Sequence, residues 1–428
     1  MAVEHQSTGE DMDALRARVE ALERELEERT VRANAAVARA QDQTYWLERW
    51  HLDLNALMRR RGASEARAAV RGVRSAYRFM HDLRRRAREQ LDSIPLRMQA
   101  TRRIVAEERA RAEATTELRF ERAISPDPLA ASPVTDLLYD RLEPGDVAEV
   151  ERSLQPAEAS HWEAAAGAER RRLVLAYAAL YGIRPALERT GLSDAMPDPS
   201  VHAMTRGARS AGGSTYYADL VVDAVQEVGA APSPGQSVLD FGCSSGRVVR
   251  VLAAAFPEVE WHGCDPQRDA IEWAANHLAG ITFARSSEVP PLAYPDELFS
   301  IVIAISIWSH FEAERALAWL DEMRRVLEPG GRLLLTTHGE ATLAHAERAG
   351  TREPEQLAEI RGALYRDGHW FTVEFGEAGD HGILDPGWGT AFLTPEWMAT
   401  RTTPAWRVAL YRPGRVKDNQ DLYVLERR

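Results

Sequence analysis

Two hydrophobic periods alternate in the C-terminal half of the chain. From Ser237 onward, short apolar runs are separated by longer segments whose apolar residues recur at helical spacing. Strands are predicted at residues 237–241, 260–264, 281–284, 299–305 and 332–337, and helices at residues 246–256, 267–278, 312–327 and 354–365. This alternation predicts an α/β fold, with a parallel sheet covered by helices on both faces. Two final strands, Trp406–Tyr411 and Asp421–Glu426, are predicted to be antiparallel because their connecting loop opens with Pro413-Gly414.

The N-terminal 60 residues follow a different period, a repeat of seven. One heptad frame runs unbroken from Met12 to Leu57, with Arg29 and Gln43 as its polar core positions. The pattern predicts a coiled coil at residues 1–60 and self-association into a homo-oligomer, most simply a parallel dimer. The alternative is a long amphipathic helix packed on its own protein.

Residues 61–125 continue as an arginine-rich helical region. The stretch from Arg59 to Arg88 carries 11 arginines against only Glu65 and Asp82. An anionic membrane surface, a nucleic acid or an acidic polymer would suit it, but a solvated helix face is the commoner meaning of such a run. Prolines at 126 and 128 then end the helix. Residues 126–200 are predicted to be a helical lead-in with three short helices, and residues 201–428 to be the α/β domain.

Composition and cysteine content bear on the cellular compartment of the protein. The chain has 428 residues, a formal net charge of −12 and two cysteines, Cys243 and Cys264, without metal-ligand spacing around them. Such cysteine usage favours a reducing compartment. The first 13 residues are polar and acidic, unlike a secretory signal, and the longest apolar runs reach about half the roughly 20 residues of a membrane helix. We therefore expect a cytoplasmic protein without a transmembrane segment.

The segment from Ser237 to Arg250 is the most informative stretch. An apolar strand ends at Asp240, turns through Gly242 and Gly246, and resumes as a helix. Glycines permit backbone conformations and close approaches that a Cβ would hinder, and the helix N-terminus can meet a ligand. Asp265 ends the second strand, where an acid can accept hydrogen bonds from a ribose. The third strand is followed by serines, and the fourth by Ser306, so four successive strand ends carry polar or glycine residues.

At these residues the chain resembles the class I S-adenosylmethionine-dependent methyltransferases. Residues 238–247 match the first motif of that family, Gly263-Cys264-Asp265 the second, and residues 327–333 the turn before the fifth strand. The resemblance covers roughly half of the chain. It implies a Rossmann-like sheet of seven strands with a C-terminal antiparallel hairpin, and S-adenosyl-L-methionine as the cofactor. The family usually has glycine in place of Ser244, and many members have an acid in place of Ser286.

The resemblance also implies roles for single residues. The glycine loop would border the methionine part of the cofactor, Asp240 would orient that loop or the cofactor amino group, and Asp265 would bind the ribose. The serines after the third strand would lie near the adenine. The predicted cofactor-binding residues are Asp240, Gly242, Cys243, Ser244, Gly246, Asp265, Ser286, Ser287 and Ser306.

Catalysis and acceptor binding have weaker signals. A base helps an oxygen nucleophile, so His310, after the fourth strand, and then His338, at the end of the fifth, are the candidate bases. For His310 the alternative is a capping or packing role before Glu312. Candidate acceptor-binding residues are Tyr216, Tyr217, Trp308 and His369.

These acceptor candidates come from three places. The tyrosines belong to a glycine-rich segment, residues 201–217, that is either a lid or an interdomain linker. Trp308 is either a pocket wall or a core residue. His369 belongs to the connection from Arg366 to Leu393, which is long enough to be a binding loop for a sugar or polyol. His381 and nearby aspartates show no tight ligand spacing, so no metal is expected.

The favoured function is a methyltransferase that acts on a small molecule or glycan, most plausibly at oxygen. The alternative is a scaffold whose methyltransferase-like domain has lost catalysis and which works through its coiled coil. A third, weaker interpretation is a nicotinamide oxidoreductase, although the glycine spacing differs from the dinucleotide fingerprint.

Overall fold

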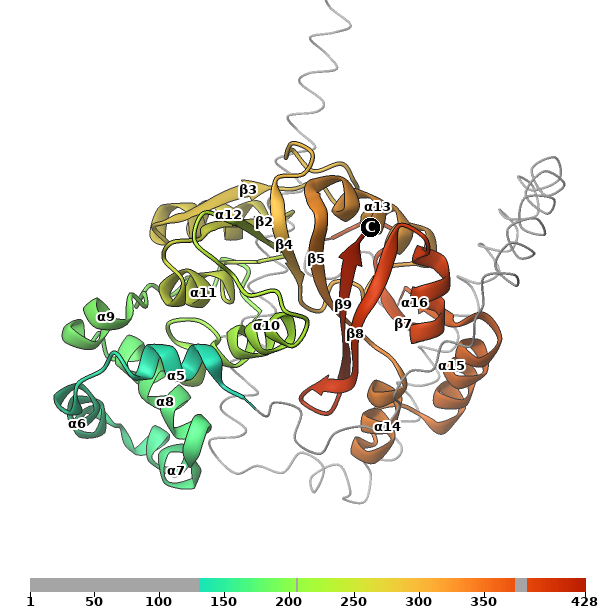
Figure 1. Ribbon diagram of the computed structural model, residues 1–428. Helices are drawn as coiled ribbons and strands as arrows, with labels where there is room; N and C mark the ends of the chain where they lie inside the picture. Colours follow the sequence, from blue (N-terminus) through green and yellow to red (C-terminus); the bar gives the residue numbers. More distant parts are fainter. Residues whose placement is uncertain (1–130, 205–206, 374–382) are drawn as a thin grey trace, which may run out of the picture. The chain divides into compact units, whose positions relative to one another are not determined.

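A computed structural model describes residues 131–204, 207–373 and 383–428 (Figure 1). The predicted coiled coil at residues 1–60 and the arginine-rich region at residues 61–125 lie outside the described residues. Among the helices of the described ranges, none combines the length and the apolar character needed to cross a membrane.

A seven-stranded sheet forms the centre of the described fold. Its strand order is β3-β2-β1-β4-β5-β9-β8. The strands are β1 Ser237–Phe241, β2 Glu260–Asp265, β3 Ile281–Arg285, β4 Phe299–Ala304, β5 Leu327–Thr337, β8 Trp406–Val416 and β9 Gln420–Arg427. The first five are parallel, and β9 runs antiparallel to β5 and β8. The predicted fold, including its C-terminal antiparallel hairpin, is confirmed.

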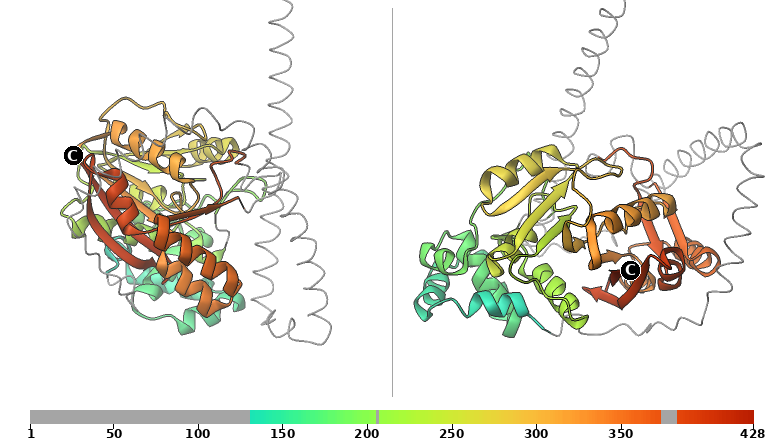
Figure 2. Two further views of the ribbon diagram at one scale, coloured as in Figure 1. Left: turned by 90° about the vertical axis from the view of Figure 1, so that its right-hand side faces the viewer. Right: turned by 45° about the horizontal axis from the view of Figure 1, so that its top comes forward.

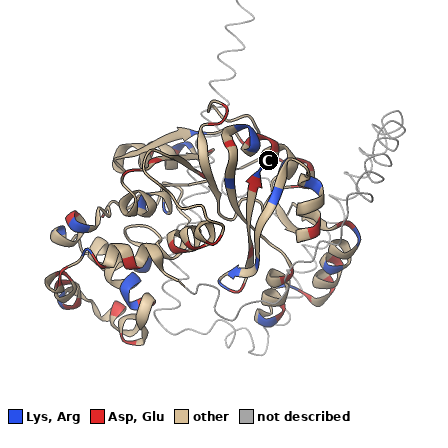
Figure 3. Ribbon diagram, in the orientation of Figure 1, with Lys and Arg blue, Asp and Glu red and all other residues tan. Residues whose placement is uncertain are grey.

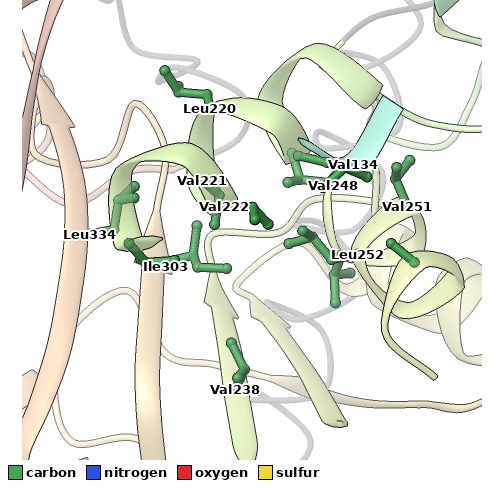
Figure 4. Close-up of a cluster of buried hydrophobic side chains, with 14 of the residues drawn as sticks. Val134, Leu220, Val221, Val222, Val238, Val248, Val251, Leu252, Ile303 and Leu334 are labelled. Carbon is green, nitrogen blue, oxygen red and sulfur yellow. The ribbon is translucent and has the colours of Figure 1, made fainter. Parts of the chain in front are cut away.

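Two hydrophobic layers enclose this sheet, because alternate residues of a strand point to opposite faces. Val238 of β1 belongs to one layer and its neighbour Leu239 to the other. Helices α10 (Thr215–Glu227) and α11 (Val249–Ala255) supply the first layer, which Figure 4 shows in part. The second layer contains the buried residues of α13 (Ala313–Val326) and α16 (Pro395–Thr402). Helix α12 (Arg268–His277) packs against β2 and β3.

Residues 133–190 form five helices, where three were predicted. They are α5 Pro133–Tyr139, α6 Pro144–Ser153, α7 Pro156–Ala164, α8 Gly167–Leu180 and α9 Arg184–Thr190. All but α8 have proline in the first turn, where its missing N–H costs nothing. Those prolines are the sequence signal for the additional helix starts.

Buried Asp219 of α10 ties this helical lead-in to the rest of the fold. Its carboxylate accepts hydrogen bonds from the N–H groups of Val134 and Thr135, at 2.9 and 2.8 Å, and from the Thr135 hydroxyl at 2.6 Å. Arg172 of α8 forms an ion pair with the same carboxylate at 2.9 Å. A single side chain thus joins α5, α8 and α10.

The chain between β5 and β8 forms a second, smaller unit of secondary structure. Helices α14 (Glu340–Ala349) and α15 (Pro354–Asp367) lead into a two-stranded antiparallel sheet of β6 (His369–Thr372) and β7 (Thr390–Leu393) (Figure 2). The connection predicted to be a long binding loop therefore begins and ends in paired strands.

Candidate active site

The turn after β1 is built by the conformation of Gly242. Its φ is 79°, in the left-handed region that favours glycine, and its N–H and that of Cys243 donate to the Cys264 carbonyl at 2.8 and 3.1 Å. A Cβ on Gly242 would lie 2.2 Å from Ile307 Cδ1. The glycine is therefore required by backbone conformation and by its contact with the chain after β4.

Ser244 is the unusual residue of this turn. It has a φ of 51°, which is costly for a residue with a side chain. Its N–H donates to Asp265 Oδ2 at 2.8 Å, and its hydroxyl lies 2.8 Å from His202 Nδ1. The N–H of His202 in turn donates to Asp269 at 2.8 Å. These bonds join the turn to β2 and to the segment that precedes α10.

Two buried acids lie beside the turn. Asp240 is 3% exposed and Asp265 is 7% exposed. Burial raises the pKa of Asp240 to about 7, against the opposite effects of the Arg247 guanidinium and the Val249 N–H. Burial also raises the pKa of Asp265 to about 6, against hydrogen bonds from the N–H groups of Gln267 and Ser244. Each acid therefore gains or loses its charge near neutral pH.

One cavity opens at the carboxyl ends of β1, β2, β3 and β4. Its empty space is about 1030 Å³, which includes open solvent at its mouth. Of the nine predicted cofactor residues, eight line it: Asp240, Gly242, Cys243, Ser244, Asp265, Ser286, Ser287 and Ser306. The four strand ends thus converge on one space, as expected for a parallel sheet.

The polar atoms of this cavity fit a large polar cofactor. Asp240 Oδ2 and the Ser286 hydroxyl are buried and have no hydrogen-bond partner within the described ranges. Unsatisfied buried polar groups are costly unless a ligand or water completes them. The Ser287 hydroxyl differs, because it donates to the Val289 carbonyl in its own loop.

His310 also lines the cavity. Its Nδ1 is 2.7 Å from the Gly389 carbonyl, an acceptor only, so Nδ1 carries a proton. The ring stacks on Trp388, with centroids 4.5 Å apart and planes at 9°. Both residues line the cavity. The imidazole therefore has a fixed tautomer and a fixed orientation.

The wall around Trp388 comes from the long connection before β7. Glu288 accepts a hydrogen bond from the N–H of Asp385 at 3.1 Å, and Arg315 of α13 forms an ion pair with the Asp385 side chain at 2.8 Å. The N–H of Gly389 donates to the His310 carbonyl at 2.7 Å. Three residues of this connection, Ile383, Asp385 and Trp388, line the cavity. That the connection binds a sugar or polyol stays a prediction.

Several predicted site residues lie elsewhere. Those absent from the cavity lining are Gly246, Tyr216, Tyr217, Trp308, His338 and His369. Gly246 has a φ of 77°, in the left-handed region that favours glycine, and a Cβ on it would lie 2.7 Å from Leu278 Cδ1. Trp308 is fully buried beside Phe241 and Phe311, as a core residue.

The two other histidines have structural contacts. His369 Nε2 donates to the Phe311 carbonyl at 3.3 Å, and burial lowers the pKa of His369 to about 4. Burial, assisted by His310 and Arg352, lowers the pKa of His338 to about 3, and its Nε2 lies 3.4 Å from the Gln420 amide nitrogen. A base with so low a pKa removes protons poorly, so His310 remains the candidate.

Other residues of the site escaped sequence reasoning. Arg247, Glu288 and Met204 line the cavity. Arg247 directly follows the glycine turn, which was the available signal; the others depend on how distant loops meet. His202 and Met204, from the segment predicted to be either a lid or a linker, line the cavity. In the described ranges, no group of three or more His, Cys, Asp or Glu side chains is placed to hold a metal; His381 lies outside them.

Residues 238–331 match the family model described as a methyltransferase domain. This stretch is a methyltransferase domain. The match supports S-adenosyl-L-methionine as the cofactor, as the resemblance implied. A probable tRNA methyltransferase 9B of Mus musculus is 31% identical over 124 residues, which are 28% of this chain and 26% of the relative. A malonyl-[acyl-carrier protein] O-methyltransferase of Methylococcus capsulatus is 34% identical over 120 residues, 27% of this chain and 42% of the relative.

The chain thus spans less than half the length of either relative. Solved structures similar to the chain include a SAM-dependent methyltransferase from Methanosarcina mazei, with 17% identity, coverage of 46% of this chain and 93% of that one, and a TM-score of 0.34. Another is magnesium protoporphyrin IX methyltransferase from Synechocystis, with 16% identity, coverage of 50% and 82%, and a TM-score of 0.34.

Proposed function

We propose that this protein is an S-adenosylmethionine-dependent methyltransferase that methylates an oxygen atom of a small molecule or glycan. The observation that carries the proposal is the layout of the cavity. Two buried acids, a glycine turn and an imidazole with a fixed tautomer line the same cavity. Such a site can hold a charged cofactor on one side and deprotonate an acceptor on the other.

The two acids and the residues of the turn hold the cofactor. Asp265 offers the remaining lone pairs of its carboxylate to the ribose hydroxyls, and Asp240 Oδ2, buried without a partner within the described ranges, suits the amino group. The Ser286 hydroxyl, buried in the same way, suits the edge of the adenine. When bound, the cofactor supplies an electrophilic methyl group on a sulfonium.

His310 acts on the acceptor. Its Nε2 accepts the proton of the acceptor hydroxyl as that oxygen attacks, while Nδ1–H stays bound to the Gly389 carbonyl. Stacking on Trp388 prevents the ring from rotating away. A positioned base of this kind contributes about 10²–10⁴-fold to rate.

Calorimetry tests the cofactor. S-adenosylmethionine should bind the full chain, and Asp265→Ala should weaken binding at least about tenfold, the loss expected for charge-assisted hydrogen bonds. Glu260→Ala is the matched control, because Glu260 lies at the far end of the same strand and is exposed. Absence of binding would favour the scaffold alternative, and binding of reduced nicotinamide cofactor instead would favour the oxidoreductase.

Methyl transfer tests His310. With methyl-labelled cofactor and a panel of hydroxyl-bearing small molecules and oligosaccharides, His310→Ala should lower turnover about 10²-fold or more while cofactor affinity stays near that of the wild type. His310→Asn is the informative control, because its amide can still donate to the Gly389 carbonyl while the Nε2 acceptor is lost. Wild-type turnover in His310→Asn would show that His310 only holds the wall.

The names of the relatives bear on the acceptor. One relative is named for methylation of a malonyl oxygen and the other as a probable tRNA methyltransferase. An oxygen acceptor in this chain agrees with the first name and with the histidine at the cavity wall.

A further inference from the structure

The turn between β8 and β9 lies at the edge of the sheet where the cavity opens. Antiparallel pairing sets Asp421 of β9 opposite Thr337, the last residue of β5. The chain just before β9 is therefore at the carboxyl ends of the parallel strands. Gln420, just before Asp421, contacts the cavity lining directly. Its Oε1 accepts a hydrogen bond from the hydroxyl of Ser306, a cavity residue, at 2.9 Å.

This turn carries Lys417, the only lysine of the chain. Its Nζ lies 5.1 Å from the centroid of the Tyr216 ring and 5.7 Å from that of Tyr217. The Tyr216 hydroxyl accepts a hydrogen bond from the Lys417 N–H at 3.1 Å, which holds the turn against the start of α10. In the part of the chain that the structure describes, no carboxylate lies within 4.0 Å of the amine.

Arg247 connects this turn to the cavity. Its guanidinium carbon lies 4.7 Å from the centroid of the same Tyr217 ring, and the residue lines the cavity. Two cations therefore share one aromatic ring. Burial lowers the pKa of Lys417, and repulsion from Arg247 and Arg209 lowers it further.

Two carboxylates act on these cations. Asp240 opposes the burial that lowers the pKa of Arg247, and Glu169 opposes the burial that lowers the pKa of Lys417, but Glu169 also binds another cation. Glu169 binds Arg209 at 3.2 Å, and Asp219 binds Arg172 at 2.9 Å. Figure 3 shows basic and acidic residues intermixed over the helices. The proximity of Lys417 and Arg247 is therefore a local feature and does not belong to a large basic surface. Like charges held close together cost free energy, and a bound anion removes that cost.

We propose that Lys417 and Arg247 bind an anionic group, a carboxylate or phosphate, of the methyl acceptor. The proposal rests on the proposed methyltransferase function and narrows its substrate class. The acceptor would place its anion at the edge formed by the β8–β9 turn and its hydroxyl toward His310. Tyr216 and Tyr217, predicted to contact the acceptor, instead support the two cations.

The single lysine permits a direct test in the full chain. Pyridoxal phosphate, an anionic aldehyde, condenses with an amine with loss of water, and borohydride reduces the imine to a stable secondary amine. Pyridoxal without the phosphate is the neutral control, and the α-amino group of Met1 is an internal reference. Peptide mapping should show the phosphate form favoured at Lys417 by about tenfold after division by its preference at Met1.

Competition identifies the source of the anion. Inorganic phosphate should protect Lys417, whereas S-adenosylhomocysteine and methylthioadenosine, which lacks the amino-acid part, should protect it equally or not at all. Protection by S-adenosylhomocysteine alone would assign the cations to the cofactor carboxylate and overturn the proposal. Equal labelling by both aldehydes would refute the anion site itself.

Variants separate the contributions. Arg247→Met should lower the pyridoxal phosphate preference at Lys417 severalfold, whereas Arg366→Met, which removes an exposed arginine of α15, should leave it unchanged. Because Arg247 is partly buried, the wild-type competition decides the matter if that variant does not fold. Failure of S-adenosylhomocysteine to bind in calorimetry would refute the methyltransferase function and leave the labelling result standing on its own.

Discussion

Ser244 offers a test of how the glycine turn is held together. A residue with a side chain costs about 1–2 kcal/mol in the left-handed conformation that Ser244 adopts. Its buried hydroxyl offsets this cost through the 2.8 Å contact with His202 Nδ1. The resemblance implies that glycine is usual at this position, and glycine would adopt this conformation without strain.

Two substitutions separate these contributions. Ser244→Ala keeps the strain and loses the hydrogen bond, which should lower the free energy of unfolding by about 1–3 kcal/mol. Ser244→Gly also loses the hydrogen bond, but it relieves the backbone strain. The added backbone freedom of glycine in the unfolded state costs about 0.5–1 kcal/mol of that gain. The glycine variant should therefore be more stable than the alanine variant by about 1 kcal/mol.

Urea denaturation followed by fluorescence measures both changes. A double-mutant cycle with His202→Ala isolates the pair, and Ser244→Ala should cost less in that background by about 1 kcal/mol. Equal stability of Ser244→Ala and the wild type would show that the hydroxyl contributes nothing. A glycine variant less stable than the alanine variant would contradict the argument from backbone strain.

Two further predictions concern buried acids. Asp219→Ala should lower the free energy of unfolding by about 3–5 kcal/mol, because it leaves Arg172 and two backbone N–H groups without their acceptor; Glu149→Ala, which removes an exposed ion pair, should cost at most about 1 kcal/mol in the same urea titration. The raised pKa values of Asp240 and Asp265, about 7 and 6, mean that the folded state keeps protons that the unfolded state releases near pH 4. Without ligand, the free energy of unfolding should therefore fall as pH rises from 5 to 8, and fall less in Asp240→Asn; an equal fall in the variant would exclude Asp240 as the source.

Most of the fold could be predicted from local patterns in the sequence. The strands and helices from Ser237 onward were predictable because each has its own hydrophobic period, and parallel pairing follows from their alternation. Eight predicted cofactor residues meet in one cavity for the same reason, since the carboxyl ends of parallel strands share one edge. His310 belongs to that set because it follows the fourth strand.

Contacts between distant segments were decided by tertiary structure alone. In the sequence, His338 and His310 both come after a strand of the sheet and look equally suited to the site. In the structure, His338 forms a parallel bridge with Phe392 and contacts Gln420, and it does not line the cavity. Trp388 and Asp385 reach the site because Glu288 and Arg315 hold their segment against it. Lys417 meets Arg247 through one tyrosine ring, although 170 positions separate them in the sequence. Hydrophobic periodicity does not predict such long-range contacts, because they depend on how the packed layers position loops that are distant in the sequence.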